Sequence, residues 1–338
     1  MKSHEYKTTV GDWIKAVLPT LVALVGLAWI LRTANGLSFL PVPPVFANPG
    51  STVLAHQAAA AKAGLPGEIV LLGDSTCMMG VDALTLEANL PGHGSVLNLG
   101  LIVWLGFEDY AGLLSNHSAV TPTRIKTVVL LVTPTKLTLK REDGMGEAWR
   151  NLRVQEKAST PKLTSWRTVK AGLGCDILRR NLLSHWMVRP LAGKGDGTIF
   201  FGFPNEIDNY MTTHQGSLIE LGAFKQSRQQ ESWSLTPSPD LAAQCKTLRE
   251  AVPVGAKLII GLTPMPESRS SIEERERRPV LLQIWNQHIN ADGVLTNLPP
   301  VMPDIFFASG GHLNLLGQKK FTAILARELS PFLEKEKR

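Results

Sequence analysis

Cysteine is scarce in this 338-residue chain, and its scarcity excludes two kinds of protein. The three cysteines, Cys77, Cys175 and Cys245, are too few for a disulfide framework and include no C-x-x-C pair. A structural metal site is therefore not expected. At most one disulfide could form, and Cys77 is most simply a small packed residue. We expect neither a bound metal nor any other cofactor.

Signatures of nucleic-acid binding are also missing, although the formal net charge is +6. Lysine and arginine alternate with acidic residues, and the chain has no zinc-finger spacing, RNA-binding aromatic pattern or basic tail. Nucleic acid is therefore not an expected partner. Apolar residues make up 44% of the chain and charged residues 19%, which is typical of a globular protein.

A long uncharged run near the amino terminus predicts a membrane anchor. Residues 16–31 carry no charge, and extension back to Trp13 adds only Lys15, giving roughly 28 Å of helix. Three lysines, at positions 2, 7 and 15, place the amino terminus in the cytoplasm. We expect residues 1–34 to be a cytoplasmic stub and transmembrane helix. A cleaved signal peptide and a buried soluble helix are the alternatives.

Short apolar runs alternate with helical stretches in the remainder, as in a parallel α/β sheet. Residues 35–66 contain a proline-rich spacer and a helix at 52–63, and residues 67–333 are expected to form the main domain, before a short tail. The predicted strands cover 68–73, 95–99, 127–132 and 256–262. The predicted helices cover 81–90, 108–115 and 315–332, the last with Asn314 as cap and with Leu316, Phe321, Ile324 and Leu325 on its inner side.

A long segment at 136–254 separates the third and fourth strands and is predicted to be an inserted cap, because loops of that length are uncommon in compact domains. Residues 136–200 hold thirteen Lys or Arg against six acids, and 165–186 could form a basic amphipathic helix. Its charge could face anionic headgroups, an anionic polymer, a partner subunit or simply water.

Two strand ends carry residues suited to nucleophilic chemistry. Ser75 follows the first strand in the turn Gly73-Asp74-Ser75, and His312 precedes the last helix. A serine hydroxyl needs an adjacent base, and histidine is the side chain best suited to that task. The carboxyl edge of one sheet could bring the two together, with the amides of Ser75 and Gly100 as oxyanion donors. Asp74 is expected to cap or brace the serine turn.

These residues resemble the SGNH (GDSL) hydrolase superfamily. The resemblance is carried by GDS at 73–75, NLG at 98–100 and GGHLN-x-x-G at 310–317. It implies a flavodoxin-like three-layer α/β/α domain in which Ser75 is the nucleophile, His312 the base and Gly100 an oxyanion donor. The family usually has an aspartate where this chain has Ser309, and an asparagine in the block that reads VTPTK at 132–136. His312 could then be oriented by Asp304, by Ser309 or by a backbone carbonyl.

An anchor followed by such a domain resembles the membrane-anchored members that act beside multi-pass O-acyltransferases, such as DltD-like and AlgJ/AlgX-like proteins. The resemblance implies acyl transfer, most simply of acetyl, to hydroxyls of an exported polysaccharide, at the outer face of a bacterial cytoplasmic membrane. A carbohydrate esterase or deacetylase of the same fold is the nearest alternative. A non-catalytic docking subunit is another.

Overall fold

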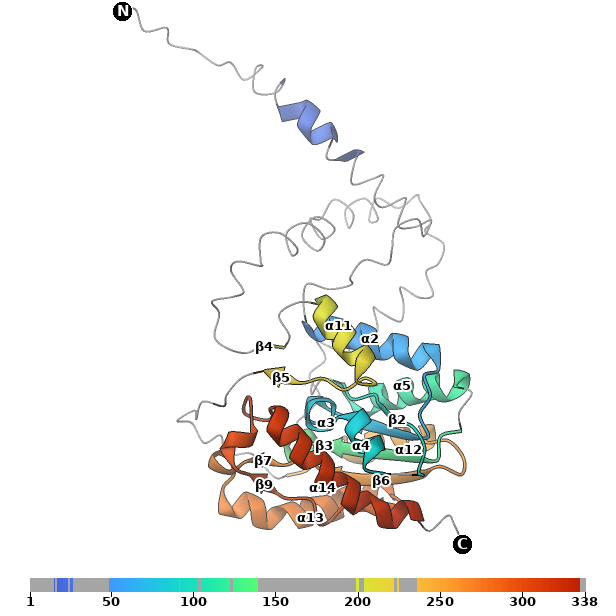
Figure 1. Cartoon of the computed structure of the whole chain (residues 1–338), viewed down its shortest axis with the longest axis vertical. Helices are drawn as coiled ribbons and strands as arrows, with labels where there is room; N and C mark the ends of the chain where they lie inside the picture. Colours follow the sequence, from blue (N-terminus) through green and yellow to red (C-terminus); the bar gives the residue numbers. More distant parts are fainter. Residues whose placement is uncertain are drawn as a thin grey trace, which may run out of the picture. The chain divides into compact units, whose positions relative to one another are not determined.

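The structure is a computed structural model whose described residues form most of one compact unit. The described residues are 15, 17–23, 25–26, 49–90, 92–101, 105–121, 124–138, 199–200, 204–221, 224 and 236–334. Contacts divide the chain into a unit of Met1–Ala47 with Arg153–Gly195 and a unit of Asn48–Leu152 with Asp196–Arg338. The sheet and the helices around it belong to the second unit (Figure 1).

Part of the predicted membrane anchor is described. Residues 15, 17–23 and 25–26 are helical, and their side chains are mostly exposed. Of the helices whose residues the structure describes, none is long and apolar enough to cross a membrane. The rest of the predicted anchor, the proline-rich spacer up to residue 48 and the predicted basic helix at 165–186 lie outside the described residues.

A five-stranded parallel sheet forms the centre of the second unit, with the strand order β2-β1-β3-β6-β8. Its strands are β1 (Ile69–Gly73), β2 (Val96–Asn98), β3 (Thr127–Val132), β6 (Lys257–Leu262) and β8 (Gly293–Val294). The central strands are almost wholly buried, as expected for a parallel sheet covered on both faces. Two small sheets pair β4 (Ile199–Phe200) with β5 (Glu220–Leu221) and β7 (Met265–Pro266) with β9 (Val301–Met302).

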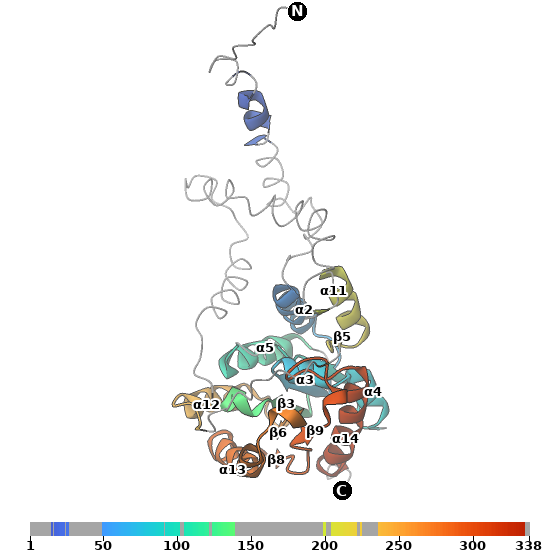
Figure 2. The same cartoon turned by 90° about the vertical axis from the view of Figure 1, so that its left-hand side faces the viewer.

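Helices cover both faces of the sheet (Figure 2). On one face lie α2 (Pro49–Ala63), α5 (Phe107–Val120), α12 (Leu241–Ala251) and α13 (Ile272–Ile289), and on the other lie α3 (Ser75–Gly80), α4 (Ala83–Ala88) and α14 (Leu315–Glu334). The remaining elements among the described residues are α11 (Pro204–Thr213) and the 3₁₀ turns η1 (Pro134–Leu137), η3 (Glu267–Arg269) and η4 (Asp304–Phe306).

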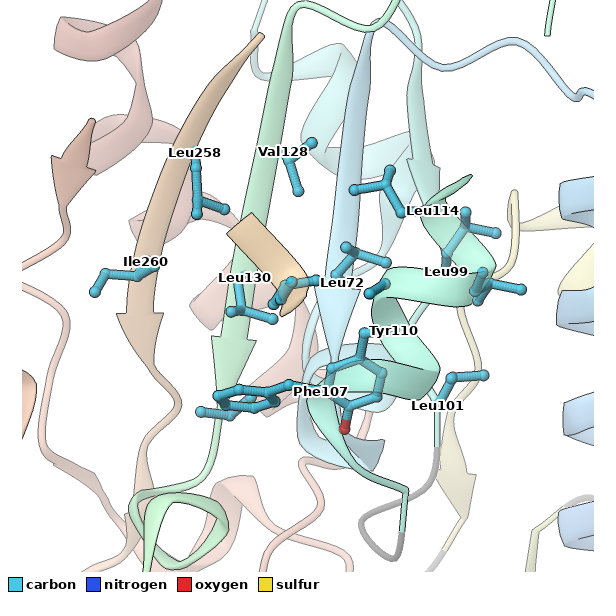
Figure 3. Packing of buried hydrophobic residues seen from close by; sticks show 14 of the residues in the cluster. Leu72, Leu99, Leu101, Phe107, Tyr110, Leu114, Val128, Leu130, Leu258 and Ile260 are labelled. Atoms are coloured by element: carbon cyan, nitrogen blue, oxygen red, sulfur yellow. The ribbon is translucent and has the colours of Figure 1, made fainter. Parts of the chain in front are cut away.

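Alternation along each strand divides the core into two layers. Leu72 of β1 and Leu130 of β3 face the α5 side, where Phe107 and Tyr110 pack against them (Figure 3). Leu71, which precedes Leu72 in β1, faces the α14 side instead. Because successive side chains of a strand point to opposite faces, one uninterrupted apolar strand contributes to both layers.

The structure confirms the parallel α/β architecture and most predicted elements. The predicted strand at 127–132 coincides with β3, and Asn314 Oδ1 caps α14 by accepting from the amides of Leu316 and Gly317 at 3.1 Å each. Leu316 is the exception on the predicted inner face of that helix, because its side chain is 62% exposed while Phe321 and Leu325 are fully buried. Leu316 lies five residues before Phe321, about 140° away round a helix of 3.6 residues per turn, so the two side chains cannot share a face.

A buried histidine gives the stability of this unit a specific pH dependence. His117 of α5 is fully buried, and burial lowers the pKa of its ring, opposed in part by the Ala61 carbonyl. The unfolded chain therefore binds a proton on this ring at a higher pH than the folded protein does. Protonation does not reduce the free energy of unfolding above about pH 6.5, the usual pKa of histidine. Below that pH the free energy of unfolding falls, until the pH has passed the lower pKa of the folded state.

We therefore expect His117→Leu to remove one acid-dependent loss of stability. The free energy of unfolding, measured with urea, should fall less between pH 7.5 and pH 5 in His117→Leu than in wild type. A wild-type minus variant difference that is the same at both pH values would contradict this assignment.

Candidate functional site

The turn after β1 ties together the carboxyl ends of three strands. Asp74 is fully buried, and its Oδ1 accepts from the amide of Thr76 at 2.9 Å, which caps α3. Its Oδ2 accepts from the amide of Thr133, after β3, also at 2.9 Å. The hydroxyl of Thr76 lies 2.7 Å from that of Thr263, after β6. Asp74 thus braces the serine turn as predicted, and Ser75 begins α3 at the edge where open α/β sheets bind ligands.

Ser75 and His312 are in direct contact. Ser75 Oγ lies 2.8 Å from His312 Nε2. On the other side of the ring, His312 Nδ1 forms a short contact with Glu220 Oε2. With Nδ1 protonated and donating to Glu220, Nε2 can accept the proton of the serine hydroxyl. The three side chains form a relay of contacts from a serine hydroxyl through an imidazole to a buried carboxylate.

Burial decreases along this relay from the acid to the base. The Glu220 side chain is 5% exposed and that of His312 is 21% exposed, while Ser75 is 7% exposed as a residue. A carboxylate that is held away from water interacts more strongly with an imidazolium than an exposed one does. The partly open imidazole remains accessible to a substrate hydroxyl.

A tight loop presents His312. The His312 carbonyl accepts from the amide of Ala308 at 2.9 Å, and Phe307 and Leu313 form an antiparallel bridge that closes the loop. The side-chain amide of Asn314 donates to the carbonyls of Ile305 and Phe307, at 2.7 and 3.2 Å. These bonds fix the backbone on both sides of the histidine.

A segment at 214–220, which we call the acid strap, positions Glu220. At its start His214 Nδ1 lies 2.7 Å from Asp82 Oδ2, and the Gln215 carbonyl accepts from the amide of Asn98 at 2.9 Å. Farther along, the Leu218 amide donates to the Met78 carbonyl in α3 at 3.0 Å. The strap is thereby bonded to the helix that carries Ser75.

Two buried amide side chains bond the acid strap to the core. Gln57 Nε2 donates to the carbonyls of Gly100 and Gly216 at 2.8 and 3.2 Å, and Gln318 Nε2 donates to the carbonyl of Leu218 at 2.8 Å. Both amide side chains are buried, and each joins the strap to another element of the core. These contacts hold the segment that carries Glu220 against the core, although Glu220 lies far from β3 in the sequence.

The two predicted oxyanion donors are placed differently. Ser75 is the first residue of α3, where a backbone N–H has no acceptor within the helix. The Gly100 amide instead donates to Asn98 Oδ1 at 2.9 Å. Gly100 does lie against α3, since a Cβ on it would be 2.9 Å from the Met78 nitrogen. In this structure its N–H is thus directed to Asn98.

Neither Asp304 nor Ser309 has the contact with the His312 ring that the sequence suggested for it. Asp304 Oδ1 accepts from the amide of Ser268 at 3.0 Å, so this carboxylate stabilises a turn and Glu220 occupies the place considered for it. Ser309 Oγ donates to Glu220 Oε2 at 2.9 Å, so the Ser309 side chain contacts the acid that orients the imidazole. A short side chain at 309 leaves room for a carboxylate from another segment.

Glu220 is the member of this candidate site that the sequence did not identify. It lies within the predicted insertion, in the run Leu218-Ile219-Glu220-Leu221. A single acid inside an apolar run was the available signal, because a buried glutamate needs a partner. Nothing local in the sequence identified that partner as His312, 92 residues away.

The site has the parts needed for acyl transfer through a serine ester. A hydroxyl, a base and an acid lie in sequence, and a helix amide adjoins the hydroxyl. Among the described residues there is no cluster of three or more His, Cys, Asp or Glu side chains that could hold a metal ion. Comparison of the chain with known proteins found no matching family model and no matching curated protein.

Proposed function

We propose that the protein is a serine-dependent acyltransferase that moves an acyl group, most simply acetyl, onto a hydroxyl of an exported polysaccharide. The observation that carries the proposal is the continuous set of contacts from Ser75 Oγ through His312 to Glu220. A serine in contact with an acid-supported histidine is the arrangement that activates a hydroxyl as a nucleophile.

Acylation would begin with attack of Ser75 Oγ on the carbonyl carbon of an acyl ester. The new Oγ–C bond forms as the serine proton moves to His312 Nε2. The bond from the carbonyl carbon to the leaving oxygen then breaks, and that oxygen takes the proton from Nε2. Glu220 stabilises the imidazolium between the two transfers. The Ser75 amide can donate to the developing oxyanion.

Deacylation would repeat these steps with a sugar hydroxyl as the nucleophile. His312 Nε2 takes the hydroxyl proton as the sugar oxygen bonds to the acyl carbon, and Ser75 Oγ leaves with that proton. Water could replace the sugar hydroxyl in the same step, so an esterase or deacetylase uses identical machinery. A site that transfers must therefore bind the acceptor better than it admits water.

The strand order supports a relationship to the SGNH hydrolases as part of this proposal. Counted along the parallel sheet alone, β2-β1-β3-β6-β8 is the order 2-1-3-4-5 of flavodoxin-like folds. The three sequence blocks of the resemblance contribute Ser75, Asn98 with Gly100, and His312 to one region. A glutamate supplied by another segment is this chain's departure from that family pattern.

The same proposal includes a membrane-anchored, extracytoplasmic domain that works with a multi-pass acyltransferase. It is supported by the uncharged run at 16–31 and by the lysines that precede it. Removal of residues 1–32 should give a protein that stays in the soluble fraction. Tight membrane association of that shortened protein would place membrane binding elsewhere in the chain.

Covalent labelling tests the proposed nucleophile. We expect a fluorophosphonate or an activated acetyl ester to modify Ser75 in wild type, with labelling absent in Ser75→Ala and at least 100-fold slower in His312→Ala. Intact-protein and peptide mass spectrometry would measure the modification. Ser115→Ala, at an exposed position of α5, is the control and should label as wild type does.

Absence of labelling in wild type would overturn the enzymatic proposal and favour a docking subunit. Labelling that persists in Ser75→Ala would place the nucleophile elsewhere. If Ser75 is acylated, transfer is separated from hydrolysis by adding an oligosaccharide acceptor and locating the acetyl group. Release to water alone would favour the esterase alternative.

A further inference from the structure

A small cavity lies at the carboxyl edge of the sheet beside the serine site. Its volume is about 30 Å³, and its walls include Thr135, Met265, Arg269, Arg275 and Arg278. Space for one water requires roughly 10–15 Å³ on this measure, so the cavity could take two or three atoms of that size. That room suits the oxygens of a carboxylate or phosphate.

Three contacts connect the cavity to the turn of Ser75 and to the loop of His312. Thr135 lies 2.7 Å, hydroxyl to hydroxyl, from Thr133, whose amide donates to Asp74. Arg269, which also lines the cavity, lies against the loop that carries His312, since a Cβ on Gly310 would be 1.6 Å from its guanidinium. The cavity therefore adjoins both the serine turn and the histidine loop.

Among the residues that the structure describes, three guanidinium groups and one carboxylate, that of Glu274, line the cavity. Within the part of the chain that the structure describes, no carboxylate oxygen lies within 4.0 Å of Arg269, Arg275 or Arg278. Arg275 Nε is buried and has no acceptor among the described residues. An N–H of a charged group that is buried without an acceptor is costly, and an anionic ligand would remove that cost.

Arg278 is a buried positive charge in the wall of the cavity. It is 8% exposed, and its guanidinium donates to three carbonyls, those of Leu262, Thr263 and Pro300, at 2.6, 2.7 and 3.2 Å. Burial lowers the pKa of Arg278 to about 9, so the group remains charged at neutral pH. Its bonded carbonyls carry no compensating unit charge, and its field acts on the cavity.

We propose that this cavity binds one anionic group, a carboxylate or a phosphate, of the polymer that accepts the acyl group. The inference rests on the proposed transfer function and adds to it an acidic acceptor. Arg269 and Arg275 would contact the anion, and the Arg278 charge would favour it. An anion held beside the serine turn would restrict how the acceptor approaches Ser75, which gives the acceptor an advantage over water.

Arg275 also has a structural role that the test must separate. Its Nη2 donates to the carbonyls of Glu267 and Ser270 at 2.8 and 3.1 Å, which holds the η3 turn. Arg269→Gln is therefore the primary variant and Arg275→Gln the second. Arg277→Gln is the matched control. Arg277 lies on α13 with Arg275, is exposed and pairs with Glu273 at 2.7 Å.

The first experiment measures anion binding without any reaction. Inorganic phosphate is titrated into the full-length protein at constant ionic strength, and binding is followed by isothermal titration calorimetry. We expect saturable binding in wild type and Arg277→Gln, with affinity at least tenfold weaker in Arg269→Gln and Arg275→Gln. No binding by wild type, or equal affinity in all four proteins, would overturn the proposal. Binding retained without any acyl transfer would overturn the transfer function alone.

The second experiment identifies the source of the anion. Acetyl transfer from an activated ester is compared for a uronic-acid oligosaccharide, a phosphorylated oligosaccharide and a neutral one. We expect wild type to prefer one of the anionic acceptors, with the ratio of its kcat/KM to that of the neutral acceptor falling about tenfold in Arg269→Gln. A preferred uronic acid identifies a carboxylate, and a preferred phosphate ester identifies a phosphate. A ratio near one in wild type, or one unchanged by Arg269→Gln, would contradict an anionic acceptor.

Discussion

Glu220→Gln is expected to slow acylation of Ser75 by about 10³- to 10⁴-fold, the range typical of losing the acid of such a triad. Glutamine keeps the shape of the side chain but removes the charge that stabilises the imidazolium. Its amide can also donate to His312 Nδ1, which would place the ring proton on Nε2, where it cannot accept from serine. The rate of acyl-enzyme formation with an activated acetyl ester measures the effect.

Asp304→Asn is the comparison variant for Glu220→Gln, because Asp304 was the carboxylate predicted from the sequence. In the structure its Oδ1 accepts from the Ser268 amide and could do so equally as an amide oxygen. We expect the acylation rate of Asp304→Asn to lie within about threefold of wild type. If Asp304→Asn were the slower variant, the relay through Glu220 would be wrong.

A second-site change separates the role of Glu220 in the reaction from any role in folding. Ser309 contacts the same carboxylate oxygen as His312, so an aspartate at 309 would lie close to the ring. We expect Ser309→Asp to restore at least tenfold of the rate lost in Glu220→Gln, because it supplies a carboxylate from the histidine loop. Restoration would show that the missing group was a charge beside Nδ1. No gain, with both variants folded, would assign Glu220 to structure alone.

The sequence was sufficient for the strands because their signal is local. Four consecutive apolar residues in β1 and five in β3 are typical of strands that are buried between two helical layers. Ser75 and His312 were predictable for the same reason, since each lies in a short block at a strand or helix end. The short strand β8 has only two residues and offered no comparable pattern.

The acid was not predictable because its position depends on contacts far apart in the sequence. Glu220 reaches His312 only because the acid strap bonds to Asn98, Met78 and Gln318, each at least 100 residues away. Such bonds join segments that are far apart in the sequence and leave no periodic pattern in the chain. The same argument applies to Gly100, whose amide is turned toward Asn98 by a side-chain bond that the NLG block does not reveal.

Gly73→Ala is expected to destabilise the protein by more than about 4 kcal/mol, beyond the usual range for single substitutions. Gly73 has a φ of +152°, and a Cβ there would lie 1.7 Å from the Leu131 carbonyl oxygen and 2.7 Å from Cys77 Cβ. Neither neighbour can move easily, because Leu131 is in the central strand β3 and Cys77 is buried in α3. Urea unfolding and soluble yield would measure the loss.

Gly80→Ala is the matched control for Gly73→Ala, because it adds the same methyl group where there is room for it. A Cβ on Gly80, at the end of the same helix, would meet Leu313 and Phe321 carbons at 3.7 Å, an ordinary contact. We expect Gly80→Ala to unfold within about 1 kcal/mol of wild type and to label at Ser75. If Gly73→Ala were equally stable, β1 and β3 could separate without cost. Close approach of these strands through Gly73 lets the Asp74 carboxylate reach the Thr133 amide, so the spacing that forbids a side chain also fixes the serine turn.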